Sequence, residues 1–417
     1  MTHLISLIRS ANALLIRVYL SLLILGTTAG SAQELAATPP IAAQPAEKSS
    51  TGAPPMETPA GALQTPTLIP GQAPVAAVQS SPANDAARFL AGLPVQPGSP
   101  IATLTPNPGW GAHARAMNQA FGQLERRQLN NIRVFRSEAI APATEESRVC
   151  VYLFSGPDFL YADALFSDCT TFVLQGLEPV EPLPNLLSVP QPALAGTLRN
   201  IEASLNTILS FSFFKTKDMR EDFERSELKG VMPAILVFMA RTGKFIQDVQ
   251  YISIDKAGNV GQGFAGATRG AKVTFTDPST GTAKSLYYFT SDLADDALKR
   301  NPGLLLFCKS LGPSNSLLKA ASYLLHSGGF ETVRNFLLEN SVAILQDDSG
   351  IPVRYFTPDR WTLRFFGIYN GPIELFKQFN QPDLRKFYAT SSPKPLTFGF
   401  GYRWNSAMST LFLAVRK

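Results

Sequence analysis

The stretch RVCVYLFSGPDFLYADALFSDCTTFVLQGLEPV, residues 148–180, decides the fold of this chain. Residues 149–154 are apolar at every position, which is typical of a strand covered on both faces. The segment Ser155-Gly156-Pro157-Asp158 then breaks the strand. Pro157 and Asp158 suit the first turn of a helix that is capped by Ser155 or Gly156. Residues 170–174 predict the next strand, so the stretch reads as strand, short helix and strand.

The N-terminal quarter of the chain predicts export. Residues 1–32 contain Arg9 and Arg17, a short apolar core at 18–26 and a small-residue end, Gly30-Ser31-Ala32, as a secretory signal peptide does. An uncleaved N-terminal anchor is the alternative. Residues 33–108 are rich in Pro, Ala, Thr, Gly and Gln and contain one aromatic residue, Phe89. Such a segment cannot bury enough apolar surface to order itself, so a disordered tether is expected, with a brief helix within 84–93.

The remaining residues, 109–417, predict one globular α+β domain. Its sheet is expected to be mixed and mostly antiparallel, with helices from 197–226 and 301–339 packed on it. Helical spacing predicts a helix over 113–129, and strands are expected at 132–135, 234–240 and 245–254. Further expected elements are a strand pair at 272–276 and 285–290, helices at 302–311, 314–326 and 331–338, a strand at 342–345, a hairpin at 353–366, short helices at 372–379 and 382–388, and a final hairpin at 396–415.

Composition limits the classes of partner. The formal net charge is +5, and loss of the two signal arginines leaves +3. No Lys/Arg block with interleaved aromatic residues is present, so no nucleic-acid partner is expected. No apolar run after the signal predicts a membrane span. Only His113 and His326 follow the signal and the cysteines are scattered, so neither a metal site nor a cofactor is predicted.

Two of the three cysteines flank the organising stretch. Cys150 and Cys169 could form a disulfide in an oxidising compartment. They could equally be buried thiols that behave as small apolar residues, and Cys308 has no obvious partner.

Two short patterns imitate known motifs without their context. Residues 261–266, GQGFAG, match a dinucleotide fingerprint, but a strand rather than a helix is expected after them, which favours a loop. Ser316-Leu317-Leu318-Lys319 matches the S-x-x-K of penicillin-binding proteins. Its partner motifs are missing, so an ordinary packed helix is the better interpretation.

One set of residues has the types needed for hydrolysis. Ser155 ends a predicted strand, His326 ends a predicted helix, and Asp347 and Asp348 follow another predicted strand. A nucleophile, a base and an orienting carboxylate could cleave an ester or amide. The G-x-S-x-G elbow is absent, a histidine at a helix end is often a cap, and Asp347-Asp348-Ser349-Gly350 is also a good turn.

The polar turn after the first buried strand is a second candidate site. In α/β folds ligands often contact such turns, so Asp158, Tyr161 and Asp163 are predicted binding residues, although the same turn also simply connects a strand to a helix. The leading hypothesis is an exported protein, periplasmic or extracellular, that binds an unknown ligand or an envelope protein without catalysis. The alternative is a serine-type hydrolase acting on an envelope or extracellular substrate.

Three stretches carry a resemblance to a family: SGPDFLYADALF at 155–166, LQDDSGIP at 345–352 and FGFGYRW at 398–404. Together they resemble an uncharacterised group of exported bacterial proteins, over most of residues 130–417. The resemblance implies export and a single compact domain, and it implies no activity.

Overall fold

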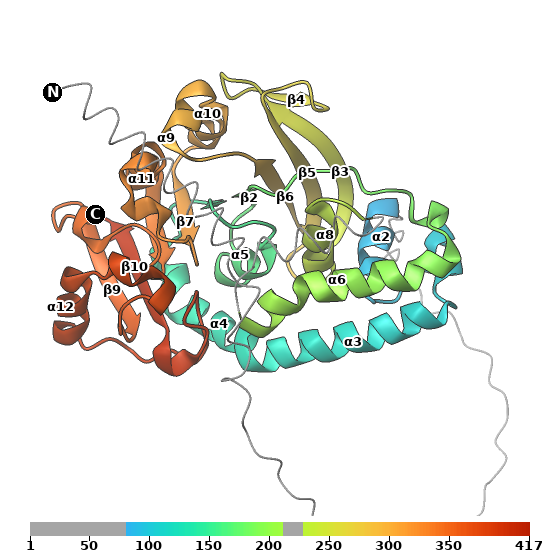
Figure 1. The fold of residues 1–417 in the computed structure, drawn as a ribbon, viewed down its shortest axis with the longest axis horizontal. Coiled ribbons are helices and arrows are strands. Elements are labelled where there is room, and N and C mark those ends of the chain that lie inside the picture. Colours follow the sequence, from blue (N-terminus) through green and yellow to red (C-terminus); the bar gives the residue numbers. More distant parts are fainter. Residues whose placement is uncertain (1–80, 212–227) are drawn as a thin grey trace, which may run out of the picture. The chain divides into compact units, whose positions relative to one another are not determined.

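A mixed ten-stranded sheet forms the centre of the protein, which we describe from a computed structural model (Figure 1). The structure describes residues 81–211 and 228–417. The predicted signal peptide, the predicted tether up to residue 80 and the charged segment expected after residue 211 lie outside these residues. The strand order is β4-β3-β5-β6-β2-β1-β7-β8-β10-β9.

Five neighbouring strands in the middle of the sheet are parallel. In spatial order they are β6 (Thr282–Thr290), β2 (Thr171–Gly176), β1 (Val149–Tyr152), β7 (Ser314–Leu318) and β8 (Ser341–Gln346). Because they are parallel, their carboxyl ends all lie at one edge of the sheet. The loops that leave these ends carry several of the residues predicted for function.

Antiparallel strands extend both sides of this parallel centre. On one side are β5 (Thr268–Asp277), β3 (Phe245–Ile254) and β4 (Val260–Gln262), and on the other are β10 (Thr410–Arg416) and β9 (Trp361–Gly367). Five strand pairings are antiparallel and four are parallel. The predicted α+β class with a mixed sheet is therefore confirmed.

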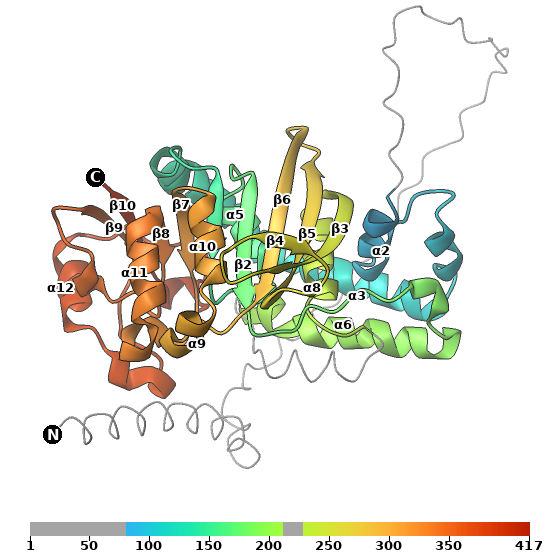
Figure 2. The same cartoon turned by 90° about the horizontal axis from the view of Figure 1, so that it is seen from above.

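Helices cover both faces of the sheet (Figure 2). Cys150 and Tyr152 of β1 belong to one core and Val151 and Leu153 to the other, as the uniformly apolar strand predicts. One face carries α2 (Pro82–Leu90), α3 (Pro108–Leu124), α4 (Asn130–Phe135), α5 (Phe159–Leu165), α6 (Gln191–Phe211) and α8 (Met232–Arg241). On this face α3 and α6 lie side by side (Figure 1). The other carries α9 (Asp295–Arg300), α10 (Gly303–Ser310), α11 (Glu331–Asn340) and α12 (Pro382–Thr390).

Short turns connect these elements. Two are π-type, η2 (Glu125–Leu129) and η3 (Arg136–Ile140). The 3-10 turns are η1 (Pro100–Leu104), η4 (Ala141–Ala143), η5 (Leu186–Ser188), η6 (Leu324–His326), η7 (Gly328–Phe330), η8 (Val353–Tyr355), η9 (Glu374–Phe379) and η10 (Ser406–Met408).

The folded domain begins before residue 109, so the predicted end of the tether is wrong. Helix α2 lies within the predicted tether, as does η1, and α2 matches the brief helix expected there. Ser81 caps α2 by accepting a hydrogen bond from the Asn84 amide. Ala87 and Phe89 of this helix are fully buried in the core. The low-complexity composition did not indicate that this short helix packs on the domain core through its apolar residues.

Two predicted strands are helices. Residues 132–135 belong to α4 and residues 234–240 to α8. Helix α8 is buried from Met232 to Ala240, so it is apolar on every side. A short apolar run does not distinguish a fully buried helix from a buried strand.

The predicted helix at 314–326 is the strand β7 followed by a loop and η6. The polar residues of β7 are completely buried between its neighbours. The side-chain amide of Asn315 donates through Nδ2 to the carbonyls of Thr144 and Ser147. The hydroxyls of Ser316 and Ser341 are 2.7 Å apart. These long-range hydrogen bonds, which no local pattern reveals, stabilise a polar segment as a central strand.

Neither of the two predicted C-terminal hairpins forms. Residues 353–355 are η8, and β9 pairs instead with β10. The segment 396–404 is irregular apart from single bridges, and β10 inserts between β8 and β9. In contrast, residues 261–266 form the end of β4 and a loop that leads into β5, as expected for a chance glycine pattern.

Candidate functional site

The strands β1 and β7 are neighbours at the point where the order of the parallel strands reverses. From β1 the chain continues to β2 on one side, whereas β7 and β8 lie on the other side of β1. Adjacent loops leave such a pair of strands in opposite directions, and in open α/β sheets ligands bind in the crevice outside the carboxyl ends at this point.

A buried ion pair lies at the carboxyl ends of β1 and β7. Lys319 follows β7, and its Nζ is 2.5 Å from Asp158 Oδ2, with both side chains 2% exposed. Asp158 is the N-cap of α5 and accepts from the Tyr161 amide, so it replaces Ser155 and Gly156 as the predicted cap. The Tyr152 hydroxyl also donates to Asp158, at 3.0 Å. Burial lowers the pKa of Lys319, against the opposing effect of Asp158.

The ammonium group of Lys319 is also held by an aromatic ring. Its Nζ lies 3.4 Å from the centre of the Tyr161 ring, which is a cation–π contact. The predicted binding residues Asp158 and Tyr161 therefore come together around one cation.

Two further carboxylates lie directly after β8. Asp347 Oδ2 accepts from the Ala320 amide, and Asp347 Oδ1 accepts from the amide and hydroxyl of Ser349. Burial raises the pKa of Asp347 despite these hydrogen bonds. Asp348 Oδ2 accepts from the Tyr323 hydroxyl at 2.7 Å. Burial, followed by the charge of Asp347, raises the pKa of Asp348 to about 7.

The loops around this cluster have an unusual backbone. Four of the five non-glycine residues with positive φ in the described part follow β1 or β7: Phe154 (63°), Ala320 (52°), Ser322 (52°) and Tyr323 (55°). Left-handed backbone at residues that have a Cβ is strained, and it persists only where surrounding contacts impose it. Such strain is concentrated at functional sites.

The segment FGFGYRW covers the cluster. Gly401 has φ of +63°, and a Cβ at this position would lie 1.8 Å from Asp347 Oδ2, so only glycine fits. The Tyr402 hydroxyl donates to the Ala320 carbonyl and lies 2.9 Å from the Ser322 hydroxyl. We call Asp158, Lys319, Asp347, Asp348 and Tyr323, together with Gly401 and Tyr402, the carboxyl-edge cluster. It brings together all three sequence stretches quoted above.

An aromatic group borders Asp348. The Tyr323 ring stacks on Phe379 with centroids 5.3 Å apart and lies 5.1 Å from the ring of Phe376. Tyr402 lies 5.3 Å from Phe376, and His326 lies 5.1 Å from Tyr323. Phe376, Phe379 and Tyr402 are half-buried, whereas Tyr323 is 1% exposed.

The predicted hydrolytic triad does not form. The Ser155 hydroxyl lies 2.8 Å and 3.1 Å from the carbonyl oxygens of Gly156 and Gln175, and it accepts from the Gln175 amide. No hydrogen bond joins it to His326 in the described residues. Ser155 is therefore a structural link between the β1 loop and β2.

The structure does bring His326 close to the backbone of Asp348 and Gly350. Burial, followed by the charge of Arg354, lowers the pKa of His326 to about 4, while the backbones of Asp348 and Gly350 oppose this shift. The Nε2 atom of His326 is buried and has no hydrogen-bond partner. The imidazole is thus neutral and packs within the aromatic group.

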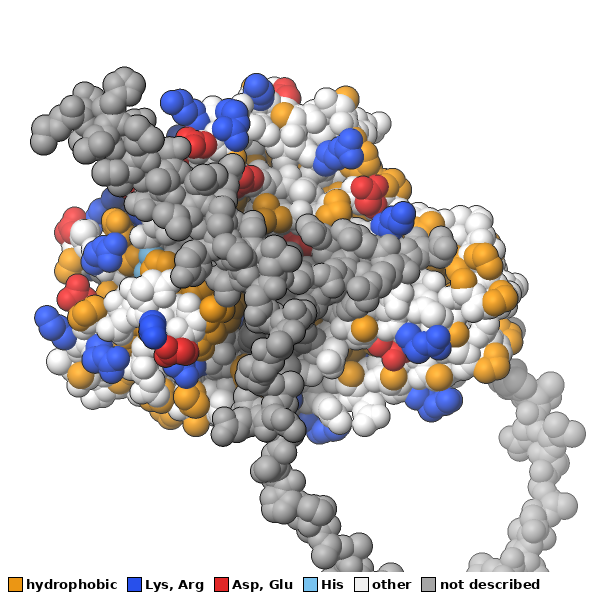
Figure 3. All heavy atoms as spheres, viewed as in Figure 1, with side chains coloured by type: hydrophobic (Ala, Val, Ile, Leu, Met, Phe, Trp, Pro, Cys, Tyr) orange, Lys and Arg blue, Asp and Glu red, His pale blue; other side chains and the backbone are white. Residues whose placement is uncertain are grey.

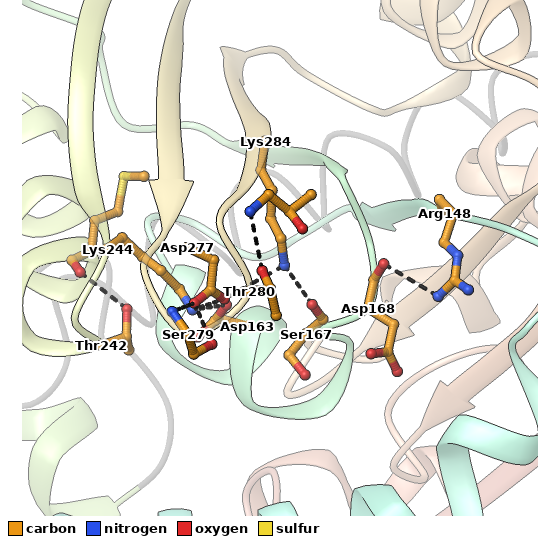
Figure 4. A network of polar contacts seen from close by, with 12 residues as sticks. Arg148, Asp163, Ser167, Asp168, Thr242, Lys244, Asp277, Ser279, Thr280 and Lys284 are labelled. Atoms are coloured by element: carbon orange, nitrogen blue, oxygen red, sulfur yellow. Dashed lines mark hydrogen bonds and ion pairs between the residues drawn. The ribbon is translucent and has the colours of Figure 1, made fainter. Parts of the chain in front are cut away.

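Asp163 belongs to a different network, with Lys244, Asp277 and Lys284 (Figure 4). Lys244 Nζ lies 2.9 Å from both Asp163 Oδ1 and Asp277 Oδ2, and Lys284 Nζ lies 3.7 Å from Asp277 Oδ2. Burial raises the pKa of Asp163. Asp277 has a pKa below its usual range because hydrogen bonds from Ser279 and Lys244 outweigh its burial. Two acids here face two lysines, which is the balance expected of a structural network.

The charged members of the carboxyl-edge cluster are covered, because Asp158, Lys319, Asp347 and Asp348 are each at most 5% exposed. A ligand therefore reaches them only if the covering segments move. A cavity of about 240 Å³ elsewhere is lined by Thr290, Ser291 and Asn301 near the end of β6. Another, of about 340 Å³, lies beside Arg88 and Lys244.

Three other sequence predictions concern a metal site, a membrane span and a disulfide. Within residues 81–211 and 228–417, no three His, Cys, Asp or Glu side chains are grouped as a metal site requires. Among the same residues, no helix is both long enough and apolar enough to cross a membrane. Cys150 and Cys169 are buried thiols that are not bridged. Burial, followed by contact with Cys169, raises the pKa of Cys150.

Basic and acidic side chains are interspersed on the face shown in Figure 3, with Lys and Arg spread among uncharged groups. The part of this face that is not covered by grey atoms shows no continuous basic stripe of the kind that tracks a phosphate backbone. The absence of a nucleic-acid partner remains a prediction.

Sequence reasoning missed Lys319, Tyr323 and Tyr402. Lys319 was visible only as the last residue of an S-x-x-K pattern in a segment predicted to be a helix. Tyr402 lies in FGFGYRW, a stretch that had no assigned role. The usable signal was the pair of polar turns after buried strands, at Asp158 and at Asp347-Asp348.

No family model, curated protein or solved structure matches the chain.

Proposed function

We propose that this chain is an exported binding protein, periplasmic or extracellular, whose small polar ligand contacts the carboxyl-edge cluster. The observation that carries the proposal is the position of Lys319, Asp158 and Asp347, because these buried charges lie at the point where the parallel strand order reverses. Export is supported by the sequence features of residues 1–32.

The electrostatics of the cluster support a ligand-binding role over a purely structural one. Lys319 pairs with Asp158 and acts on Asp347 only through its charge, and Asp348 forms no direct ion pair with a described basic residue. Burying a carboxylate without a paired charge is costly, so a fold gains nothing from this arrangement alone. Perturbed pKa values of several groups in one place are typical of functional sites.

The strained backbone gives a second, independent argument. Ala320, Ser322 and Tyr323 hold left-handed conformations in the loop that connects Lys319 to the aromatic group. A loop that only connected two elements could have glycine at these positions, or a different backbone conformation, and so avoid the strain.

The hydrolase alternative lacks support. Ser155 is engaged with Gln175 and Gly156, and the neutral His326 forms no hydrogen bond with it. A serine that is not bonded to a base is a weak nucleophile.

The binding role is tested by calorimetric titration of the purified exported protein with choline, succinate and glucose, which represent cations, anions and neutral solutes. We expect binding of one class that is lost in Asp348→Asn and kept in the exposed control Asp383→Asn. No binding of any class, or binding indifferent to Asp348→Asn, contradicts the proposal.

Export is tested separately by cell fractionation of the full chain and of a chain without residues 1–32. We expect only the full chain to leave the cytoplasm. If both chains remain in the cytoplasm, export is refuted.

A further inference from the structure

The carboxyl-edge cluster already holds one ammonium group inside the protein. The Lys319 ammonium lies between the Asp158 carboxylate, 2.5 Å from its Nζ, and the face of Tyr161, 3.4 Å from the ring centre. A carboxylate and an aromatic face are the two groups that proteins combine to bind organic cations. The cluster itself therefore already binds one ammonium group, that of Lys319, in this way.

A carboxylate and aromatic rings also lie near each other at Asp348. Its carboxylate accepts from Tyr323, whose ring contacts Phe376 and Phe379 at centroid distances of 5.1 and 5.3 Å. No ion pair with a described lysine, arginine or histidine neutralises Asp348. Arg403 acts on it only at longer range, while its own guanidinium donates to the carbonyls of Gly371 and Pro372.

We propose that the ligand is a small organic cation, of the methylated or quaternary ammonium class, held by Asp348 and the aromatic rings of Tyr323, Phe376 and Phe379. This inference rests on the proposed binding function and names its ligand class. A cation supplies the paired charge that Asp348 lacks, and its methyl groups pack against rings.

Aromatic rings distinguish this class of cation from a metal ion. A divalent metal requires several oxygen ligands at short distances, and the rings of Phe376 and Phe379 offer none. A quaternary ammonium forms no hydrogen bonds, so it loses little when aromatic faces replace its water.

We expect a ligand to reach Asp348 from the side of η9. This turn carries Phe376 and Phe379, both half-buried, and the backbone of Phe376 departs from helical geometry at φ of −121° and ψ of 22°. A turn that is interrupted at the aromatic residue and exposed on both sides of it can move without opening the core. The cation then replaces ring contacts between Phe379 and Tyr323.

The test compares choline with its neutral isostere, 3,3-dimethylbutan-1-ol, by calorimetry on the purified protein. The two share shape and differ in charge, so we expect choline to bind at least about tenfold more tightly. Phe379→Ala should weaken choline binding by roughly tenfold. The control is Phe387→Ala, which removes an aromatic side chain of α12 that is 39% exposed, and it should leave choline binding unchanged.

Each other result has a definite meaning. Binding of succinate or glucose but not choline, with the same dependence on Asp348, overturns the cation assignment and leaves the binding function standing. Calcium that binds in place of choline assigns the carboxylates to a metal and also overturns it. If none of these solutes binds, the binding function and the cation assignment fail together. Equal affinities for choline and its isostere would show that the site recognises apolar shape without charge, which overturns the cation assignment.

Discussion

Replacement of Lys319 by methionine should destabilise the protein strongly, because it leaves the carboxylate of Asp158 buried without its cation. The two side chains are each 2% exposed and 2.5 Å apart, so solvent cannot substitute for the lost partner. Removing one member of a buried pair costs about 3–5 kcal/mol. The Tyr152 hydroxyl and the Tyr161 amide still donate to Asp158, which favours the lower end of this range.

The double variant Lys319→Met with Asp158→Asn should recover much of this loss. Asparagine keeps the cap of α5 and carries no charge, so position 158 no longer buries an unpaired carboxylate. We expect a coupling energy of about 2–3 kcal/mol in the double-mutant cycle. The assay is urea unfolding followed by circular dichroism and tryptophan fluorescence, with the slope of the transition checked for each variant.

A matched control comes from an exposed pair of similar length. Lys377 Nζ lies 2.6 Å from Glu374 Oε1, with side chains 73% and 84% exposed. Lys377→Met should not change the unfolding midpoint measurably, because water screens such pairs. Additive effects of Lys319→Met and Asp158→Asn, or a loss at Lys319 no larger than at Lys377, would refute the reasoning.

Three further predictions concern the same region. The pKa of Asp348, raised to about 7, makes its contribution to stability fullest below about pH 4 and lost as the pH rises through 7. In urea unfolding, the difference in the free energy of unfolding between wild type and Asp348→Asn should therefore decrease as the pH rises from about 4 to 7. His326, whose pKa is lowered to about 4, has the opposite pH dependence, but it is present in both proteins and cancels in the comparison. Ser155→Ala should lose about 1–3 kcal/mol in the same assay, because the Gln175 amide loses its acceptor, and the wild type should resist labelling by a fluorophosphonate probe. Gly401→Ala should destabilise by more than about 1–2 kcal/mol, the cost of left-handed alanine, and should abolish ligand binding because its Cβ displaces Asp347; unchanged values in either measurement would contradict this.

The sequence predicts the β1–α5–β2 unit because each of its signals is local. The apolar run of β1, the Pro157-Asp158 turn and the second apolar run need no distant partner to be recognised. Failures occur where distant contacts decide the structure. The polar residues of β7 are stabilised as a strand by Thr144, Ser147 and Ser341, and α8 is apolar on all sides because the core surrounds it.

The candidate site shows the same division. Asp158, Asp347 and Asp348 were identified because a polar turn after a buried strand has a local pattern. Their convergence was not predictable, since it depends on β7 lying between β1 and β8. Lys319 was missed for that reason, because it follows a strand that local spacing assigns to a helix.

Helix α5 shows why one of its acids is assigned to function and another to structure. Asp158 caps α5 from outside its first helical residue, whereas Asp163 lies within the helix, and the two carboxylates pair with different lysines. They therefore join different networks. At Asp163, two aspartates face Lys244 and Lys284, and the charges balance within the chain. Around Asp158, Lys319 pairs with Asp158 and acts on Asp347, whereas Asp348 forms no ion pair in the described residues and its pKa rises to about 7. Both networks are buried, so burial alone does not explain the difference between them. Asp348 differs from Asp163 in lacking a paired basic side chain, and the proposed cation would supply that charge.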